Sequence, residues 1–327
     1  MANKAVLAGG SGFLGRALTG RLVADGWEVV VLTRDPEKFP APAGGAAVRA
    51  VAWNGETAGA WRKELDGAAA LVNFAGRSIE CVHTLEHSRE ILASRLQATA
   101  ALGRAAALVK QPPAVWVQAS AVGYYGNTGP EPREEGAPAG RGFLAEVCRQ
   151  WEEAFAAVEL PATRRVTLRL GVVLDRDHGV LPLLRRLAGR YLGGRAGNGR
   201  QYFSWIHRED LVAILGQVLG RPEFSGVYNA CAPAPVTNGD LMRRMRAAVG
   251  RPWCPPAPAP LVRLVAHTWL GIDSHLVLHG QRAVPARLVA AGFAFKYPTL
   301  AAALDDLVGR SPAAPGPAGG SGGAPPA

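Results

Sequence analysis

Lysine and cysteine are scarce in this chain of 327 residues, and long apolar runs are absent. The four cysteines lie far apart, at positions 81, 148, 231 and 254, and no pair has the spacing of a zinc site. Isolated cysteines are typical of reduced thiols, and no apolar stretch approaches the roughly 18 residues of a membrane-spanning helix. A predicted strand begins by residue 4, which leaves no room for a signal peptide. We therefore expect a cytoplasmic protein without a metal site or a membrane partner.

The cationic side chains are almost all arginine, because lysine supplies only five of the 36. The formal net charge of +10 is compatible with nucleic-acid binding, but no nucleic-acid-binding motif accompanies it. One arginine-rich region contains Arg185, Arg186, Arg190, Arg195, Arg200 and Arg208. We expect this region either to meet an anionic substrate or to be solvated surface, and we expect no nucleic-acid partner.

A glycine-rich segment directly follows the apolar run at residues 5–7. Gly9, Gly12 and Gly15 have the spacing G-x-x-G-x-x-G, and an amphipathic segment follows them. The first two glycines permit a tight turn and a close approach to a pyrophosphate, whereas the third lets the helix pack close to the sheet. The helix N-terminus offers free N–H groups to the anion. We therefore expect a dinucleotide to bind at Gly9, Gly10, Ser11, Gly12, Phe13, Leu14 and Gly15.

The end of the second predicted strand bears on which dinucleotide binds. NAD enzymes usually place an acidic residue there for the ribose 2′-OH, whereas an arginine accommodates a 2′-phosphate. Here Thr33 and Arg34 follow the strand, and Asp35 comes one place later. This order favours NADP(H) over NAD(H). The alternative is that Arg34 is a solvated loop residue and Asp35 holds the ribose.

Strand and helix patterns alternate along the first half of the chain. Further strands are predicted over 29–32, 47–53, 69–74, 115–120 and 166–174, and helices over 87–110 and 143–158. Such alternation predicts an α/β fold with a Rossmann-like, doubly wound parallel sheet. We assign an NAD(P)-binding domain to residues 1–178, with a sheet that can recruit later segments, and a smaller, mostly helical C-terminal cap to residues 179–310. Residues 311–327 contain only Ser, Pro, Ala and Gly and are predicted to be disordered.

Several motifs lie beyond the glycine-rich segment GGSGFLG at 9–15. They are VNFAG at 72–76, ASAVGYYG at 119–126, FLAEVC at 143–148, GRQYFSWIH at 199–207 and GQRAVP at 280–285. With these motifs the chain resembles the atypical, extended short-chain dehydrogenase/reductases. It is most similar to the nucleoside-diphosphate-sugar epimerase-like group called epimerase family proteins, which carry a C-terminal domain of unknown function. The resemblance implies an NADP(H)-binding fold in which Asn73, Ala75 and Gly76 line the cofactor and the C-terminal half supplies the substrate pocket.

The resemblance breaks down at the residues that usually carry catalysis. Most members of this superfamily use a Tyr-x-x-x-Lys pair with a serine, because a tyrosine with an ordinary pKa near 10 is a poor base at neutral pH. This chain has no such pair, and Phe143 and Val147 stand where the tyrosine and lysine are expected. Either the acid–base groups are rewired, or the chain binds NADP(H) without turnover.

Three hydroxyl groups near the predicted site are candidate catalytic groups. Ser120 ends an apolar strand and can hydrogen-bond a substrate carbonyl or satisfy a turn, although an ungapped comparison places the superfamily serine on Ala121. Tyr124 and Tyr125 lie in a glycine-flanked loop, where each can donate a proton or pack. The other titratable candidates are Glu146, Cys148 and His207. A reactive thiol at Cys148 needs an electropositive surrounding, and the alternative is an inert buried thiol.

Candidate substrate contacts come from the motif at 199–207. Arg200 offers a bidentate fork to an anionic substrate, and surface solvation is the alternative. Trp205 and His207 are expected to shape the substrate pocket, although the run from Ser204 to Asp210 also fits a helix N-terminus.

Together these features predict an NADP(H)-dependent oxidoreductase or epimerase-like enzyme. Its substrate is expected to be a small carbonyl or alcohol, either anionic or nucleotide-linked. The alternative is a non-catalytic NADP(H)-binding regulator or interaction protein that has lost the Tyr-x-x-x-Lys pair. A homodimer is compatible with either function.

Overall fold

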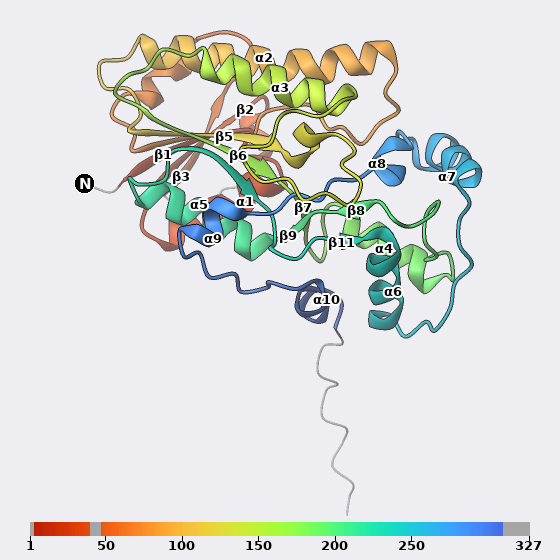
Figure 1. Ribbon diagram of the computed structural model, residues 1–327. Coiled ribbons are helices and arrows are strands. Elements are labelled where there is room, and N and C mark those ends of the chain that lie inside the picture. The colour runs from red at the N-terminus through yellow and green to blue at the C-terminus, as the bar shows by residue number, and fades with distance from the viewer. Residues whose placement is uncertain (1–2, 40–46, 310–327) are drawn as a thin grey trace, which may run out of the picture.

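A seven-stranded, fully parallel sheet forms the centre of the protein (Figure 1). The computed structural model describes residues 3–39 and 47–309. The strand order is β10-β6-β5-β4-β1-β2-β3, so the direction of winding reverses between β1 and β4. Ligands of doubly wound folds bind at the carboxyl ends of the strands, at this switch point. The predicted Rossmann-like fold class is confirmed.

The elements have the following bounds. The sheet contains β1 (Lys4–Ala8), β2 (Glu28–Thr33), β3 (Val48–Ala52), β4 (Ala70–Asn73), β5 (Val115–Ala121), β6 (Arg164–Leu170) and β10 (Gly226–Ala230). Two short strand pairs are β7 (Val172–Leu174) with β9 (Trp205–His207), and β8 (Tyr202–Phe203) with β11 (Val236–Thr237). The longer helices are α1 (Phe13–Ala24), α2 (Leu85–Ala107), α3 (Phe143–Ala156), α4 (Val180–Gly189), α5 (Arg208–Gly220), α6 (Asn238–Ala248) and α10 (Leu300–Val308). The shorter ones are α7 (Ala259–Val265), α8 (His275–Leu278) and α9 (Ala286–Ala290).

Helices cover both faces of the sheet. Successive strand residues point to opposite faces, so Ala5 and Leu7 pack with α1 and α5, whereas Val6 and Ala8 pack with α2 and α3. Figure 1 shows α2 and α3 on one side of the sheet and α1 and α5 on the other. The strands are therefore apolar on both faces, as a buried parallel sheet requires.

The C-terminal region divides between the sheet and a separate core. The sheet recruits β10 from beyond residue 178, and α5 packs against it, so both belong to the layers of the central sheet. A separate apolar core contains Trp205 and side chains of α4, α6 and α10. This second core is mostly helical, as expected for the cap. The predicted disordered segment at 311–327 lies outside the described residues.

Two local features differ from the predicted boundaries. α2 begins at Leu85 because the Thr84 hydroxyl accepts a hydrogen bond from the His87 N–H at 3.1 Å, which caps the helix. The strand predicted over 166–174 is interrupted at Gly171 and forms two strands. β6, before Gly171, pairs with β10, whereas β7, after it, pairs with β9. A Cβ on Gly171 would lie 3.0 Å from the Cβ of Cys231, so the segments approach closely at this glycine.

Candidate nucleotide-binding site

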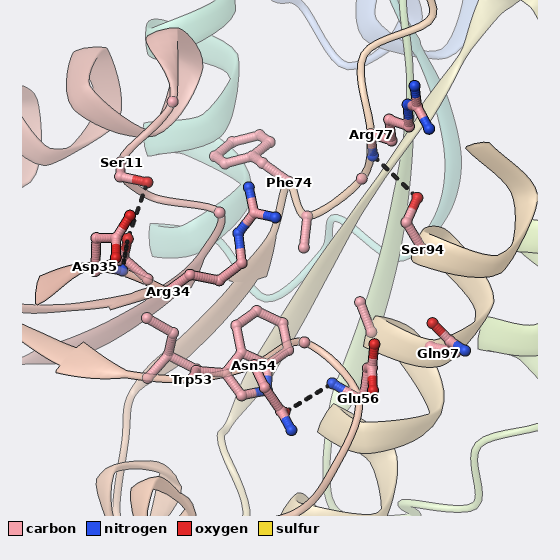
Figure 2. A pocket seen from close by; sticks show the side chains of 18 of the residues that line it. Ser11, Arg34, Asp35, Trp53, Asn54, Glu56, Phe74, Arg77, Ser94 and Gln97 are labelled. Carbon is pink, nitrogen blue, oxygen red and sulfur yellow. Dashed lines mark hydrogen bonds between the residues drawn. The ribbon is translucent and has the colours of Figure 1, made fainter. Parts of the chain in front are cut away.

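A cleft of about 1090 Å³ opens at the switch point, between the turn after β1 and the loop after β4 (Figure 2). Its walls also include the ends of β2 and β3 and one face of α2. The lining residues from these segments include Gly9, Ser11, Gly12, Arg16, Arg34, Asp35, Lys38, Trp53, Asn54, Phe74, Ala75 and Gly76. This is the location that the glycine-rich segment predicts for a dinucleotide.

The glycines of the turn after β1 have separate structural tasks. Gly9 has a φ of +71°, and a Cβ there would lie 2.9 Å from the Ala75 nitrogen. A Cβ on Gly15 would lie 2.3 Å from the Cα of Gly10, so this contact holds α1 against the turn. By contrast, a Cβ on Gly12 would meet only the Gly9 carbonyl oxygen, at 3.4 Å, and Gly12 lines the cleft. Gly12 therefore leaves open the surface that a pyrophosphate would approach.

The seven residues of the predicted cofactor turn divide between the cleft and the core. Gly9, Ser11 and Gly12 line the cleft. Gly10 packs beneath the turn against Gly15, and Leu14 packs against the apolar core of α1 and α5. Phe13 faces the C-terminal half of the chain, where its ring stacks on His178.

Three cations gather where β2 enters the cleft. Figure 2 shows the Arg34 side chain extending into the cleft, and Arg16 and Lys38 also line it. Asp35 pairs with Lys38 at 3.3 Å, whereas no acidic group within the described ranges pairs with Arg34. The site is therefore net positive and has an arginine available for an anion.

Trp53 and Asn54, at the end of β3, form another wall of the cleft. The Asn54 side chain accepts hydrogen bonds from the Glu56 and Thr57 N–H groups, which shapes the turn after the strand. The Trp53 indole is buried, and its Nε1 has no hydrogen-bond partner among the described residues. The Trp53 ring packs against Trp61 in the apolar core beneath this wall. The open surface at Gly12, the uncapped N-terminus of α1 and Arg34, which has no acidic partner among the described residues, together fit an anionic dinucleotide.

Asn73 supports the loop after β4 from beneath. Its amide donates to the Gln118 side chain at 3.0 Å, and its Oδ1 accepts from the Ala75 N–H at 2.9 Å. The side chain is fully buried, whereas Ala75 and Gly76 line the cleft. Asn73 therefore positions the two residues that face a ligand.

The hydroxyl of Ser120 belongs to a buried network at the end of β5. It donates to the Glu152 carboxylate at 2.6 Å, and Arg169 forms a bidentate ion pair with the same carboxylate at 2.8 and 2.9 Å. Ser120 is 3 % exposed and does not line the cleft. The Ser120 hydroxyl thus donates its hydrogen bond to a protein carboxylate and not to a ligand in the cleft.

The two tyrosines occupy different environments. Tyr125 is buried and its hydroxyl donates to Asn229 at 2.8 Å and accepts from Arg169 at 2.9 Å. Burial raises the pKa of Tyr125, so it is a poor base. Tyr124 is half-buried, and the Arg169 guanidinium lies 3.5 Å from the centre of its ring. Of the two, only Tyr124 keeps partial access to solvent.

The start of α3 is apolar where the superfamily pair is expected. Phe143 is the first residue of the helix and packs on His83, and Val147 is buried. Burial raises the pKa of the Cys148 thiol to about 11, and Glu152 adds to this effect. Cys148 is therefore protonated at neutral pH. Glu146 is exposed and pairs with Arg149, away from this buried network.

The predicted substrate contacts are not brought together. Arg200 is exposed, whereas Trp205 is fully buried and its indole donates to the Ala234 carbonyl at 3.1 Å. His207 is also buried and caps α5, because its Nδ1 accepts from the Glu209 N–H at 3.1 Å. These contacts place Trp205 and His207 in the core of the C-terminal region, since polar groups within the fold satisfy their nitrogens.

Burial of His207 predicts a pH-dependent loss of stability. Burial lowers the pKa of this imidazole in the folded state, whereas the unfolded chain keeps an ordinary value near 6.5. The unfolded state therefore takes up the proton first as the pH falls, and the free energy of unfolding decreases below about pH 6.5. We expect the melting temperature to fall between about pH 6.5 and pH 5, and to fall less in His207→Asn, which keeps a capping acceptor. Melts followed by circular dichroism measure this. The exposed His267→Asn is the control, and an unchanged decline in His207→Asn would contradict the assignment.

Known proteins match this chain over most of its length. A profile of the NAD dependent epimerase/dehydratase family matches residues 5–231, and a domain of unknown function, DUF1731, matches residues 257–307. The chain belongs to the NAD dependent epimerase/dehydratase family. The resemblance found in the sequence is thereby confirmed, including the C-terminal domain that marks the epimerase family group.

Relatives in this family include plant and animal proteins. The human epimerase family protein SDR39U1 is 34% identical over 313 residues, which cover 93% of this chain and 99% of that protein. The chloroplastic SDR39U1 homologue of Arabidopsis thaliana is 36% identical over 301 residues, covering 89% and 82%. Since that relative is named chloroplastic, the family is not restricted to the cytoplasm. None of the helices within residues 3–39 and 47–309 combines the length and the apolar composition of a membrane-spanning segment.

Solved structures of relatives have the same fold. A crystal structure of human SDR39U1 with NADPH has a TM-score of 0.80 and 31% identity, and it covers 93% of this chain and 99% of that one. A nucleoside-diphosphate sugar epimerase from Corynebacterium glutamicum has a TM-score of 0.73 and 33% identity, covering 94% and 59%. A family member with this fold is thus known with NADPH.

The sequence motifs did not indicate Trp53 or His178 as candidate ligand contacts. Trp53 follows the third strand, and polar or aromatic residues at strand ends are a general signal for ligand contact in this fold. His178 lies in a turn about 165 residues from Phe13 in sequence, and no local pattern predicts their contact.

Proposed function

We propose that the chain binds NADP(H) in the cleft at the switch point and transfers hydride between it and a small carbonyl or alcohol. The observation that carries the proposal is Arg34, a cation without an acidic partner in the described residues, in a cleft that Gly12 leaves open. The NADPH in the crystal structure of human SDR39U1 supports the choice of cofactor.

Each wall of the cleft has a task in this proposal. The N–H groups at the start of α1 hold the pyrophosphate, because no side chain caps that helix and no acidic residue lies in its first turn. Arg34 forms charge-assisted hydrogen bonds with the 2′-phosphate, and Arg16 and Lys38 add positive charge. Trp53 and Asn54 form the wall beside the adenosine half.

NADPH, when bound, would supply the hydride, and the chain would orient the substrate beside it. Phe143 and Val147 stand where the usual Tyr and Lys are expected and cannot transfer a proton, and the Ser120 hydroxyl donates its hydrogen bond to Glu152. A proton for the reduced substrate therefore comes from another group or from solvent. The same observation favours a second function, a regulator that binds NADP(H) without turnover.

A turnover assay separates the two functions. We expect purified protein to consume NADPH, followed at the nicotinamide absorbance band, with at least one member of a panel of aldehydes, ketones and quinones. Gly12→Val protein gives the background, since it lacks the open surface for the pyrophosphate. Binding of NADPH without consumption across the panel would favour the regulator.

A further inference from the structure

The turn between β7 and α4 meets the glycine-rich turn of the nucleotide site. The His178 ring stacks on the Phe13 ring, with centroids 5.0 Å apart and planes 9° apart. Phe13 is the first residue of α1, directly after Gly12. The imidazole thus lies beside the helix terminus that holds the pyrophosphate in the proposed function.

A buried carboxylate fixes the orientation of this imidazole. The Asp175 side chain is 2% exposed, and its Oδ1 lies 3.0 Å from the His178 Nδ1 and accepts from the His178 N–H at the same distance. Arg208 pairs with the other oxygen at 2.6 Å. Although burial opposes it, these hydrogen bonds and the Arg208 charge keep the pKa of Asp175 below its ordinary value.

The ionised carboxylate determines which imidazole nitrogen is free. A carboxylate only accepts hydrogen bonds, so the proton of the neutral ring lies on Nδ1. The Nε2 lone pair is then available. The side chain is 58% exposed, and within the described ranges Nε2 has no protein partner. An oriented imidazole with a free acceptor is a group that can bind a hydroxyl or amide donor.

The topology indicates which part of a dinucleotide lies nearest to His178. The cleft with Arg34 and Trp53 is formed by the ends of β2, β3 and β4, which is the side for the adenosine 2′-phosphate. His178 follows β7, which continues from β6 on the opposite side of the switch point. A pyrophosphate held at the N-terminus of α1 would lie between these two sides, so the nicotinamide riboside would extend toward His178.

We propose that His178, oriented by Asp175, binds the nicotinamide riboside of the cofactor through Nε2, which accepts a hydrogen bond from a ribose hydroxyl or the carboxamide. His178 is a positioning residue for that half of the cofactor. This inference rests on the proposed binding of NADP(H).

Calorimetric titration with whole and truncated ligands tests the inference. The ligands are NADPH, NADH and adenosine 2′,5′-bisphosphate, which lacks the nicotinamide riboside. We expect His178→Ala to weaken NADPH and NADH about fivefold each, the effect of one lost hydrogen bond, and to leave the bisphosphate unchanged. His178→Phe retains a ring for stacking on Phe13 but has no acceptor, so it should bind as weakly as His178→Ala. The exposed His267→Ala should bind all three ligands like the wild type.

The outcomes distinguish this inference from the proposed function. Wild-type affinity in His178→Ala, or its restoration in His178→Phe, would overturn the role of Nε2 and leave the NADP(H) site intact. An equal loss for the bisphosphate would also overturn it, because the effect would then lie in the adenosine half. Failure of the wild-type protein to bind NADPH would overturn the proposed function together with this inference.

Discussion

Replacing Gly12 with valine is expected to lower the affinity for NADPH and NADH by more than about 100-fold, or about 2.7 kcal/mol. The reason is steric: Gly12 lines the cleft, so a larger side chain occupies the space that the pyrophosphate needs. The fold should tolerate the change, because Gly12 has an ordinary φ of −73° and a Cβ there meets only one atom, at 3.4 Å. We expect a stability loss of about 1 kcal/mol, since valine is a poor helix-capping residue. Calorimetry and thermal melts measure the two effects separately.

Two other glycines of α1 serve as matched controls. Gly15→Ala places a Cβ 2.3 Å from Gly10 and should lower the melting temperature strongly, because backbone must move. A Cβ on Gly20 would have no neighbouring atom within 4 Å. Gly20→Ala should therefore bind NADPH and NADH like the wild type, with unchanged or higher stability. Folded Gly12→Val protein with wild-type affinity would show that the cleft is not the pyrophosphate site.

Replacing Arg34 with alanine is expected to lower the affinity for NADPH about 10- to 100-fold and the affinity for NADH less than about twofold. The guanidinium supplies charge-assisted hydrogen bonds, each worth about 1.5–3 kcal/mol, and only NADPH carries the phosphate that receives them. Within the described ranges no acidic side chain pairs with Arg34, so its removal leaves no buried charge behind. The ratio of the two dissociation constants is the quantity to measure, because it cancels any general effect on binding.

The control for Arg34 is an arginine distant from the cleft. Arg221 directly follows α5 and pairs with Glu223 at 3.6 Å, so Arg221→Ala should leave both affinities unchanged. Lys38→Ala is expected to give a smaller selective loss than Arg34→Ala, because Asp35 already offsets its charge. Equal losses of NADPH and NADH in Arg34→Ala would show that Arg34 does not bind the 2′-phosphate.

The half of the chain that forms the cleft could be predicted from the sequence because its signals are local. A strand, a turn and a helix follow one another at residues 4–24, and the spacing of three glycines within them carries the prediction. Arg34 was identified in the same way, from its place directly after a strand. Such features depend on residues that are neighbours in sequence, so a short stretch of the sequence is enough to recognise them.

The positions of the other candidate residues depend on contacts between distant segments. Tyr125 follows β5 closely in sequence. It is nevertheless buried, and its hydroxyl donates to Asn229, which is 104 residues away. His207 is paired with Asp306, 99 residues away, and its role in the core follows from that contact. The motifs at 119–126 and 199–207 identified the family, but they did not show which of their side chains face a ligand.

Parallel calorimetric titration of the wild-type protein with NADPH and NADH tests whether the cleft binds NADP(H). We expect saturable binding of NADPH with one site per chain, and NADH binding that is at least about tenfold weaker, the effect of one charge-assisted contact. If neither dinucleotide binds, the assignment of the cleft as a nucleotide site is contradicted. Equal affinities for NADPH and NADH would contradict the role of Arg34 in binding the 2′-phosphate.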